Sequence, residues 1–462
     1  MNTSPQQSNH GGHGCFFPRP CRWLCRWPTI VIVLVLFSSG CDKKEPAAKL
    51  ADGGKAASET VPPVDQVVND NPDDVAALLE AGYLLQTNDA GNVTELTIAT
   101  NESVAESLPH LSGLTNVEVA RFTGPGMSDE GMSVIAEWKK IRRLDLSESA
   151  ITDETLASVG QLESLEVLNL RRTAVSQAGL AKLSKLQQLR AIDLRNTNVE
   201  DEAMAEIAKL KSLADVQLEK SKITDKGVVK LAGLPLKSFN ANACTPLSNK
   251  TLEVLGGMER LESIQLDTTR IDDDGMPYLK NLSKLKRLRI RNTDVTGAGF
   301  KAIAGLNHLQ RFELRDSSAD DEAVEVISAL PKVTYLDLSE CRLISAAGLK
   351  QIGKLDNLEY LGLWSTDTDD EVIAEFSELT NLITLDLKST KISDVAIDTL
   401  LKLQSLENLN VAGTRLTDDG FRKLAALPNL KVLNVANTSI GFDVIDDLVE
   451  KYPNLEVAES DL

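Results

Sequence analysis

The sequence contains few aromatic residues, few cysteines and no excess of positive charge. Aromatic side chains make up 4% of the 462 residues, and there are six cysteines. Six cysteines in a chain of this length are too sparse for a disulfide-stabilised scaffold. Lysine and arginine number 49 against 68 acidic residues, which gives a formal net charge of −19. Such a chain lacks the basic excess that neutralises nucleic-acid phosphates, so we expect no nucleic-acid partner.

Motifs for catalysis and cofactor binding are also missing. The sequence contains neither the G-x-x-x-x-G-K-[ST] phosphate-binding loop nor the G-x-G-x-x-G dinucleotide fingerprint. Beyond residue 40 there are two histidines, His110 and His308, each just before a predicted strand. We interpret both as solvated loop residues, because two isolated histidines do not make a zinc site. The sequence therefore predicts a protein that is not an enzyme and that holds neither a metal nor a cofactor.

The first 40 residues have the features of a secretory signal. They contain no Asp or Glu, and Arg19, Arg22 and Arg26 precede an apolar run over 30–37. A positive flank, an apolar core and small residues before a cleavage site are typical of signal peptides. The run of eight apolar residues is too short to span a bilayer, which needs about 20. We therefore predict a signal peptide over 1–40 rather than a permanent transmembrane helix.

The segment Ser38-Ser39-Gly40-Cys41 resembles the lipobox of bacterial lipoproteins. In that family the cysteine is acylated and becomes the first mature residue, so the resemblance implies a lipid anchor on Cys41. Ser38 stands where the family prefers Leu, and small residues here also suit the ordinary signal peptidase, so simple secretion is the alternative. The residues that follow are rich in Ala, Lys, Gly, Pro and Asp. That composition does not bury enough surface to fold, so we interpret 41–71 as a lipidated cysteine and a flexible tether.

From about residue 93 onwards one pattern repeats along the chain. Each copy reads L-x-x-L-x-L and then a small residue, and the alternation places both strand leucines on one face. The copies recur at steps of 24 residues with deviations of one. Their first leucine, or an equivalent Ile or Val, stands at 141, 165, 189, 213, 236, 261, 285, 309, 333, 358, 382, 406 and 430. A fixed period of this length is the signature of a solenoid of stacked copies.

A helix is predicted after each strand. Its start is seen in the stretch 223–228, where Thr224 caps the helix and Asp225 lies at its positive end. The acidic runs 272–274 and 367–371 fall at the same point of their copies, so we interpret them as helix starts rather than as Ca²⁺ ligands. Cys244 and Cys341 occupy the small-residue position after the strand. We interpret them as buried turn thiols rather than as metal or redox groups.

This pattern resembles the leucine-rich repeat, in particular the helix-bearing repeats of F-box adaptors and bacterial GALA-type effectors. Their I-T-D-x-G-L stretch is present here as Ile223-Thr224-Asp225-Lys226-Gly227-Val228. The resemblance implies an α/β solenoid, or horseshoe, with a parallel β-sheet on the concave face and helices on the convex face. No segment has room for an F-box, and the chain is more similar to repeat-only exported lipoproteins of environmental bacteria. We expect an N-terminal cap over 72–92 and a leucine-rich-repeat domain over 93–462 that ends in a closing helix.

One part of the predicted concave face differs from the rest. The outward positions beside the strand leucines are mostly small or polar, but four adjacent strands carry arginine and large aromatic residues. These residues, here called the concave cluster, are Arg287, Arg289, Arg291, Arg311, Arg315, Tyr335, Tyr360 and Trp364. Arg, Tyr and Trp dominate binding energy at interfaces, so we predict a ligand-binding site here. The alternative is a solvated face on which the arginines pair with Asp267, Glu313 and Asp337.

Taken together, these features favour a non-enzymatic binding module that recognises a protein or an anionic glycan through its concave face. We expect it to be exported and held at the bacterial cell membrane or cell envelope by a lipid on Cys41, with secretion as the alternative. Two other functions stay open. One is a structural or adhesive protein of the cell envelope, and the other is an effector-like adaptor related to F-box leucine-rich-repeat proteins.

Overall fold

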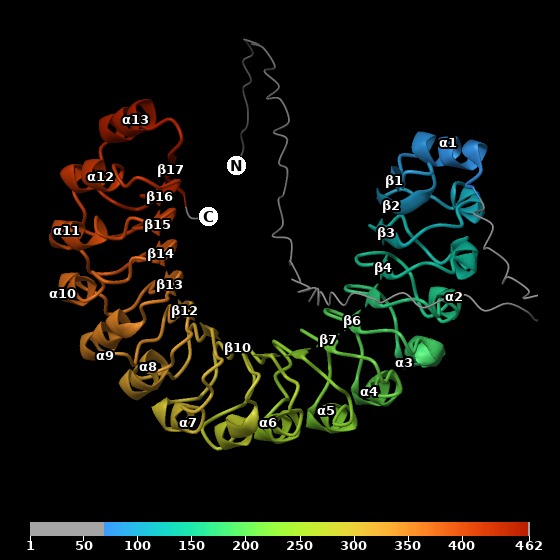
Figure 1. Cartoon of the computed structure of the whole chain (residues 1–462), viewed down its shortest axis with the longest axis horizontal. Helices are drawn as coiled ribbons and strands as arrows, with labels where there is room; N and C mark the ends of the chain where they lie inside the picture. The colour runs from blue at the N-terminus through green and yellow to red at the C-terminus, as the bar shows by residue number, and fades with distance from the viewer. Residues whose placement is uncertain (1–68, 461–462) are drawn as a thin grey trace, which may run out of the picture. The chain divides into compact units, whose positions relative to one another are not determined.

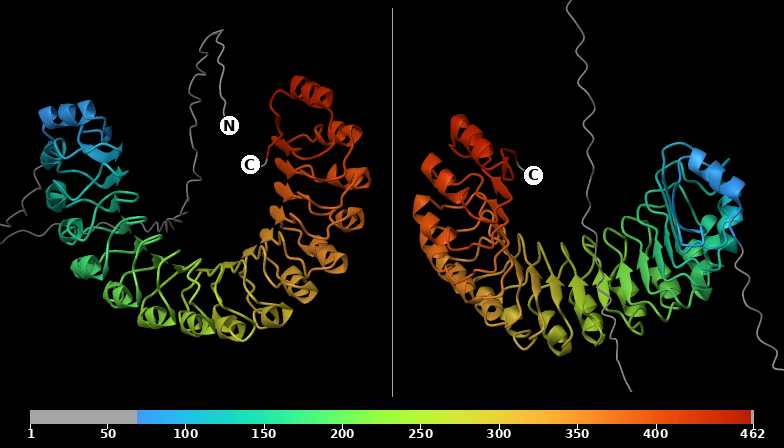
Figure 2. Two further views of the ribbon diagram at one scale, coloured as in Figure 1. Left: turned by 180° about the vertical axis from the view of Figure 1, so that it is seen from behind. Right: turned by 45° about the horizontal axis from the view of Figure 1, so that its top comes forward.

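The repeats stack into one open, curved solenoid (Figure 1). The computed structural model describes residues 69–460, so Cys41, the predicted signal peptide and most of the predicted tether lie outside the described residues. Short strands follow one another along the concave side, and helices cover the convex side (Figures 1 and 2). The predicted solenoid, with its parallel sheet and outer helices, is confirmed.

Seventeen strands form a single sheet. Each strand from β2 onwards pairs in parallel with the next one in the chain, and β1 pairs with β2 in the antiparallel direction. The strands are β1 (Leu84–Thr87), β2 (Val93–Ala99), β3 (Val119–Thr123), β4 (Arg143–Asp145), β5 (Val167–Asn169), β6 (Ala191–Asp193), β7 (Asp215–Gln217), β8 (Ser238–Asn240), β9 (Ser263–Gln265), β10 (Arg287–Arg289), β11 (Arg311–Glu313), β12 (Tyr335–Asp337), β13 (Tyr360–Gly362), β14 (Thr384–Asp386), β15 (Asn408–Asn410), β16 (Val432–Asn434) and β17 (Glu456–Ala458).

A helix follows every strand from β2 to β16, as the sequence predicts, although some of these helices are of the tighter 3₁₀ kind. The α-helices are α1 (Pro72–Glu80), α2 (Thr155–Val159), α3 (Gln177–Ala181), α4 (Asp201–Ile207), α5 (Asp225–Lys230), α6 (Asn249–Gly256), α7 (Gly297–Lys301), α8 (Asp321–Ser328), α9 (Ala346–Lys350), α10 (Asp370–Ala374), α11 (Ile397–Leu400), α12 (Asp418–Leu424) and α13 (Phe442–Lys451). The 3₁₀ helices are η1 (Leu108–Gly113), η2 (Met132–Glu137), η3 (Lys182–Lys185), η4 (Met276–Asn281), η5 (Gln351–Lys354) and η6 (Asp394–Ala396).

The repeat leucines form one core that runs along the whole solenoid. Leu168, Leu288 and Leu385 occupy the same position of three different strands, and all three are fully buried. Each repeat covers the apolar face of the one before it, so the core grows by the same increment with every copy. The inward assignment of the strand leucines is confirmed.

The small residue after each strand closes a turn. The hydroxyl of Thr293 donates a hydrogen bond to the backbone oxygen of Ile290 at 2.8 Å, and most copies repeat this bond. Cys244 and Cys341 are buried at the same position, where their thiols donate to the backbone oxygens of Leu218 at 3.2 Å and Leu314 at 3.1 Å. Burial raises the pKa of Cys341 to about 11. Both are therefore turn thiols, as predicted.

One conformational feature of the turn is not visible in the sequence pattern. The residue just before the small one is left-handed in copy after copy, with φ of 59° at Glu148, 50° at Asn292 and 60° at Glu340. Its N–H points to the next repeat, as in the 3.0 Å bond from Asn292 to the backbone oxygen of Arg315. The parallel hydrogen-bond ladder thus continues beyond the three-residue strands.

Aspartates at the helix starts join neighbouring repeats. Asp201, the first residue of α4, accepts hydrogen bonds from both the N–H and the hydroxyl of Thr224, each at 2.7 Å. Thr224 is the N-cap of α5 and also accepts from the N–H of Lys226. In the two acidic runs, Asp273 accepts from Thr296 and Asp370 from Ser393 in the same way. The interpretation as helix-start residues is confirmed for the run 367–371, where Asp369 is the N-cap of α10. The run 272–274 lies instead in the turn just before η4. The bonds of both runs cross between repeats.

The two histidines differ from each other. His308 lies in an exposed turn before β11, as predicted. The loop interpretation of His110 is wrong, because this residue lies within η1, and its Nδ1 is 2.7 Å from a carboxylate oxygen of Asp74 in α1. Helix α1 packs on η1 and brings Asp74 to the ring.

The hydrogen bonds between Asp201 and Thr224 should stabilise the folded protein. Asp201→Ala removes both acceptors of Thr224 and should lower the free energy of unfolding by about 2 kcal/mol, since hydrogen bonds to charged groups contribute about 1.5–3 kcal/mol. The neighbouring substitution Glu202→Ala is the control, because Glu202 is exposed in the same helical turn. Urea unfolding followed by circular dichroism measures both variants. Equal midpoints for the two would contradict a stabilising role for these hydrogen bonds.

Candidate functional site

The sheet register brings the eight residues of the concave cluster together. Arg287, Arg311, Tyr335 and Tyr360 are direct register partners across the four adjacent strands β10 to β13. Arg289 is the partner of Glu313 in the neighbouring outward row. The other three members of the concave cluster follow their strands by two residues and form a third row.

Glu313 is the centre of the arginine part of the cluster. Its side chain is 1% exposed, and its two carboxylate oxygens accept from several guanidinium groups. Oε1 is 2.7 Å from Nη2 of Arg287 and 2.6 Å from Nε of Arg311, while Oε2 is 2.7 Å from Nη2 of Arg291. Arg289 stands 3.7 Å from the same carboxylate. One buried charge therefore holds four arginines in place.

Other carboxylates balance the remaining positive charge. Asp267 is 2.5 Å from Nε of Arg289, Asp337 is 3.5 Å from Arg291, and Glu340 is 2.8 Å from Arg315. Five guanidinium groups thus face four carboxylates, and the cluster carries little net charge. The pairing with Asp267, Glu313 and Asp337, which the sequence left as an alternative, is present.

Burial raises the pKa values of Glu313 and Asp267, and the neighbouring guanidinium groups lower them. Burial disfavours ionisation of Glu313, but the surrounding arginines, Arg287 foremost, outweigh it and lower the pKa of this carboxyl. At Asp267 burial outweighs the attraction of Arg289, and the pKa is raised. Burial also raises the pKa values of Tyr335 and Tyr360, so both phenols stay protonated at neutral pH.

The aromatic members form a stack with the arginines. The rings of Tyr335 and Tyr360 lie 4.0 Å apart and nearly parallel, at 4°. The guanidinium carbon of Arg311 lies 3.5 Å from the centre of the Tyr335 ring. Trp364 is contacted by Arg315 at 4.2 Å and by Lys388 at 4.9 Å. Each ring is thus held by flat or cationic neighbours, and the cluster is ordered before any partner arrives.

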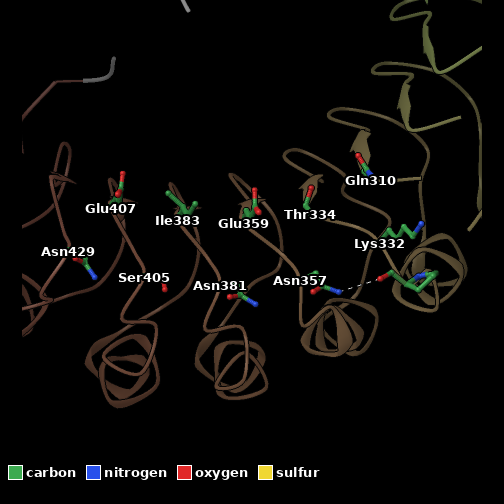
Figure 3. Close-up of a pocket in the computed structure, with 11 residues that line it drawn as sticks. Gln310, Lys332, Thr334, Asn357, Glu359, Asn381, Ile383, Ser405, Glu407 and Asn429 are labelled. Carbon is green, nitrogen blue, oxygen red and sulfur yellow. Dashed lines mark hydrogen bonds between the residues drawn. The ribbon is translucent and has the colours of Figure 1, made fainter. Parts of the chain in front are cut away.

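Two hollows adjoin the cluster at the edge of the sheet where the strands begin. The smaller has a volume of about 300 Å³ and includes Arg287, Arg311, Tyr335 and Tyr360 in its lining. The larger, about 790 Å³, runs along the residues that precede strands β11 to β15 (Figure 3). This edge was not predicted from the sequence, because the residues just before the strands vary from copy to copy. A detectable signal was Ile383, an apolar residue where the neighbouring copies are polar.

The described residues contain neither a metal-binding group nor a membrane-spanning helix. Within 69–460, no set of three or more His, Cys, Asp and Glu side chains is arranged to hold a metal ion. In the same range no helix combines the length and the apolar character that crossing a membrane requires. Cys41 lies outside this range, so its acylation stays a prediction.

Comparisons with known proteins identify the repeat. A family model described as a leucine-rich repeat region matches residues 121–339 and 317–456. A leucine-rich repeat protein of Leptospira interrogans is 17% identical, with a TM-score of 0.51 over 81% of this chain and 93% of that one. An internalin of Listeria monocytogenes is 20% identical, with a TM-score of 0.48 over 82% and 100%. At 17% identity the likeness to the Leptospira protein shows the fold alone. No curated protein sequence matches the chain.

The central carboxylate predicts a pH-dependent stability effect. Glu313→Gln keeps the shape of the side chain but leaves four arginines without their shared counter-charge. We expect a loss of about 3 kcal/mol at pH 7, at the lower end for a broken buried pair because the guanidinium groups are partly exposed. The pKa of Glu313 is lowered in the folded protein, so its stabilisation is present above its ordinary pKa and is lost as pH falls through the lowered value. The deficit of the variant should therefore shrink on acidification.

Thermal unfolding at pH 7 and at acidic pH measures this effect. Glu407→Gln is the matched control, since Glu407 is 38% exposed and pairs with one lysine, Lys431, at 2.8 Å. Such a surface pair contributes about 0–1 kcal/mol. A Glu313→Gln variant as stable as this control at pH 7 would show that the carboxylate does not organise the cluster.

Proposed function

Because the chain belongs to the leucine-rich repeat family, we propose that it is a non-enzymatic binding module that recognises a protein partner through its concave face. Stacked repeats present a long surface at fixed spacing, which suits recognition of another molecule. The proposed contact surface is the concave cluster together with the strand residues around it.

The observation that carries this proposal is the pre-ordered stack of Arg311, Tyr335 and Tyr360 beside Trp364. Aromatic residues and arginine supply most of the energy of interface hot spots. Side chains that are already immobilised lose less entropy when a partner binds. Arg311 and Arg315 pack on aromatic rings, yet their side chains remain 38% and 41% exposed to solvent. The cluster therefore offers ordered contact area with polar groups at its margin.

A protein partner fits this surface better than an anionic glycan. An anionic glycan would need arginines with available charge, but Glu313, Asp267, Asp337 and Glu340 already pair with them. A sugar ring would also need an open aromatic face. Both faces of the Tyr335 ring are covered, one by Arg311 and the other by Tyr360, because these two residues are its register partners on the neighbouring strands.

The proposed location is the bacterial cell membrane or cell envelope, through a lipid on Cys41. The support lies in the sequence: arginines, an apolar run over 30–37 and the lipobox-like Ser38-Ser39-Gly40-Cys41. A predicted tether of some 30 residues would let the binding face stand on the order of 30 Å from the membrane surface. Secretion without a lipid is the alternative.

The partner should depend on Trp364. Crosslinking and affinity capture from the protein's own cells, with the tether intact, identifies the partner, and titration then measures its affinity. Trp364→Ala should weaken binding by about 2 kcal/mol or more, as expected for an interface hot spot, and leave folding nearly unchanged. Asn434→Ala on the same face is the control. A captured partner that binds Trp364→Ala and wild type equally would place recognition elsewhere.

The anchor should depend on Cys41. Cys41→Ala removes the thiol that would carry the lipid, so the protein should leave the membrane fraction. Mass spectrometry of the mature amino terminus measures the modification directly. Finding an unmodified Cys41 in membrane-associated wild-type protein would refute lipid anchoring.

A further inference from the structure

The two hollows beside the concave cluster lie next to each other, and Gln310, Thr334 and Glu359 line both of them. The larger hollow lies on the side of these three residues that faces the helices, and it follows the edge of the sheet from Gln310 towards Glu407 (Figure 3). We call it the rim groove.

The rim groove has two walls of different character (Figure 3). The wall nearer the concave face consists of the residues that precede strands β11 to β15, namely Gln310, Thr334, Glu359, Ile383 and Glu407. The wall nearer the helices carries asparagines whose amides bind the preceding repeat. Asn357 donates to the backbone oxygen of Pro331 at 3.3 Å, Asn381 to Asp356 at 2.8 Å and Asn429 to Gln404 at 2.9 Å. These bonds tie the second wall to the preceding repeats.

Glu359 is the one carboxylate of the rim groove that makes no ion pair within residues 69–460, whereas most carboxylates of its row do; Glu118, outside the groove, is the other unpaired one. Glu166 pairs with Arg142, Glu262 with Lys286, and Glu407 with Lys431. Glu359 is exposed. On the next strand Ile383 is 39% exposed, one of the large apolar side chains that remain at the surface. Lys332 lies on the opposite wall, and no ion pair joins it to Glu359. An exposed carboxylate outside any ion pair, next to an exposed isoleucine, complements a ligand that carries a cation beside an apolar group.

We infer that the rim groove binds an extended polypeptide segment of the partner, with a basic side chain opposite Glu359 and an apolar side chain against Ile383. This inference rests on the proposed function and extends its footprint from the concave cluster onto the sheet edge. Five neighbouring strands at about 4.8 Å span roughly 19 Å, which matches about six residues of extended chain at 3.3 Å each. Beside the groove, the two faces of the Tyr335 ring are covered by Arg311 and by Tyr360.

A hexapeptide selection tests this inference before the cellular partner is identified. Random hexapeptides displayed on phage are selected on the purified full chain, and the affinity of synthetic versions is measured by fluorescence polarisation. Selected peptides should be enriched in Arg or Lys, with an apolar residue two positions away. Glu359→Lys should lower their affinity at least ten-fold, and replacing the basic residue of the peptide by Glu should restore binding to that variant. Ile383→Ser should weaken binding while keeping the preference for a basic residue.

Glu118→Lys is the matched control. Glu118 is an exposed residue directly before β3, in the same row as Glu359 but outside the groove. Selection of acidic peptides, equal binding to the Glu359→Lys and Glu118→Lys variants, or self-association that Glu359→Lys abolishes would each overturn the inference. If the captured cellular partner is lost with Trp364→Ala but kept with Glu359→Lys, the groove assignment fails and the proposed function stands. If neither variant loses the partner, both fail.

Discussion

The bond between an aspartate of one repeat and the helix start of the next constrains the rest of the structure. Asp201 accepts from Thr224, and it also occupies the space beside Gly227, where a Cβ would lie only 2.5 Å from its Oδ1. Asp, Thr and Gly are thus coupled across repeats, because the glycine makes room for the aspartate that binds the threonine. This coupling explains the Thr-Asp-x-Gly stretch and requires each repeat to advance by nearly the same number of residues.

Constant spacing turns the concave face into rows of side chains in register, and the candidate site is a consequence of those rows. Arg311, Tyr335 and Tyr360 stack because they occupy one position on three adjacent strands. Glu313 reaches arginines of two strands for the same reason, since its own strand lies beside β10. The scaffold supplies the spacing, and the variable outward residues supply the chemistry of the proposed recognition. In the rim groove the residues that precede strands β11 to β15 form another such row, at the same spacing.

The 24-residue period was enough to predict the strands, the outer helices, the buried leucines and the turn thiols Cys244 and Cys341, because each depends on residue type within one repeat. It also placed the eight cluster residues on neighbouring strands. Features that depend on pairs of repeats were harder to predict. The left-handed position accepts residues as different as Glu148 and Asn292, so it leaves no residue signature. The groove and the contact between His110 and Asp74 depend on side chains that vary from copy to copy.

We propose that recognition takes place on the concave face between β10 and β14. Site-specific photocrosslinking in the protein's own cells tests it most directly. A benzophenone side chain at position 384 replaces Thr384, the register neighbour of Tyr360, and a second variant carries it at Val395, which is 76% exposed within η6 among the convex helices. We expect a crosslinked protein partner from position 384 and none from position 395. Crosslinking from position 395 alone, or in equal yield from both, would contradict it.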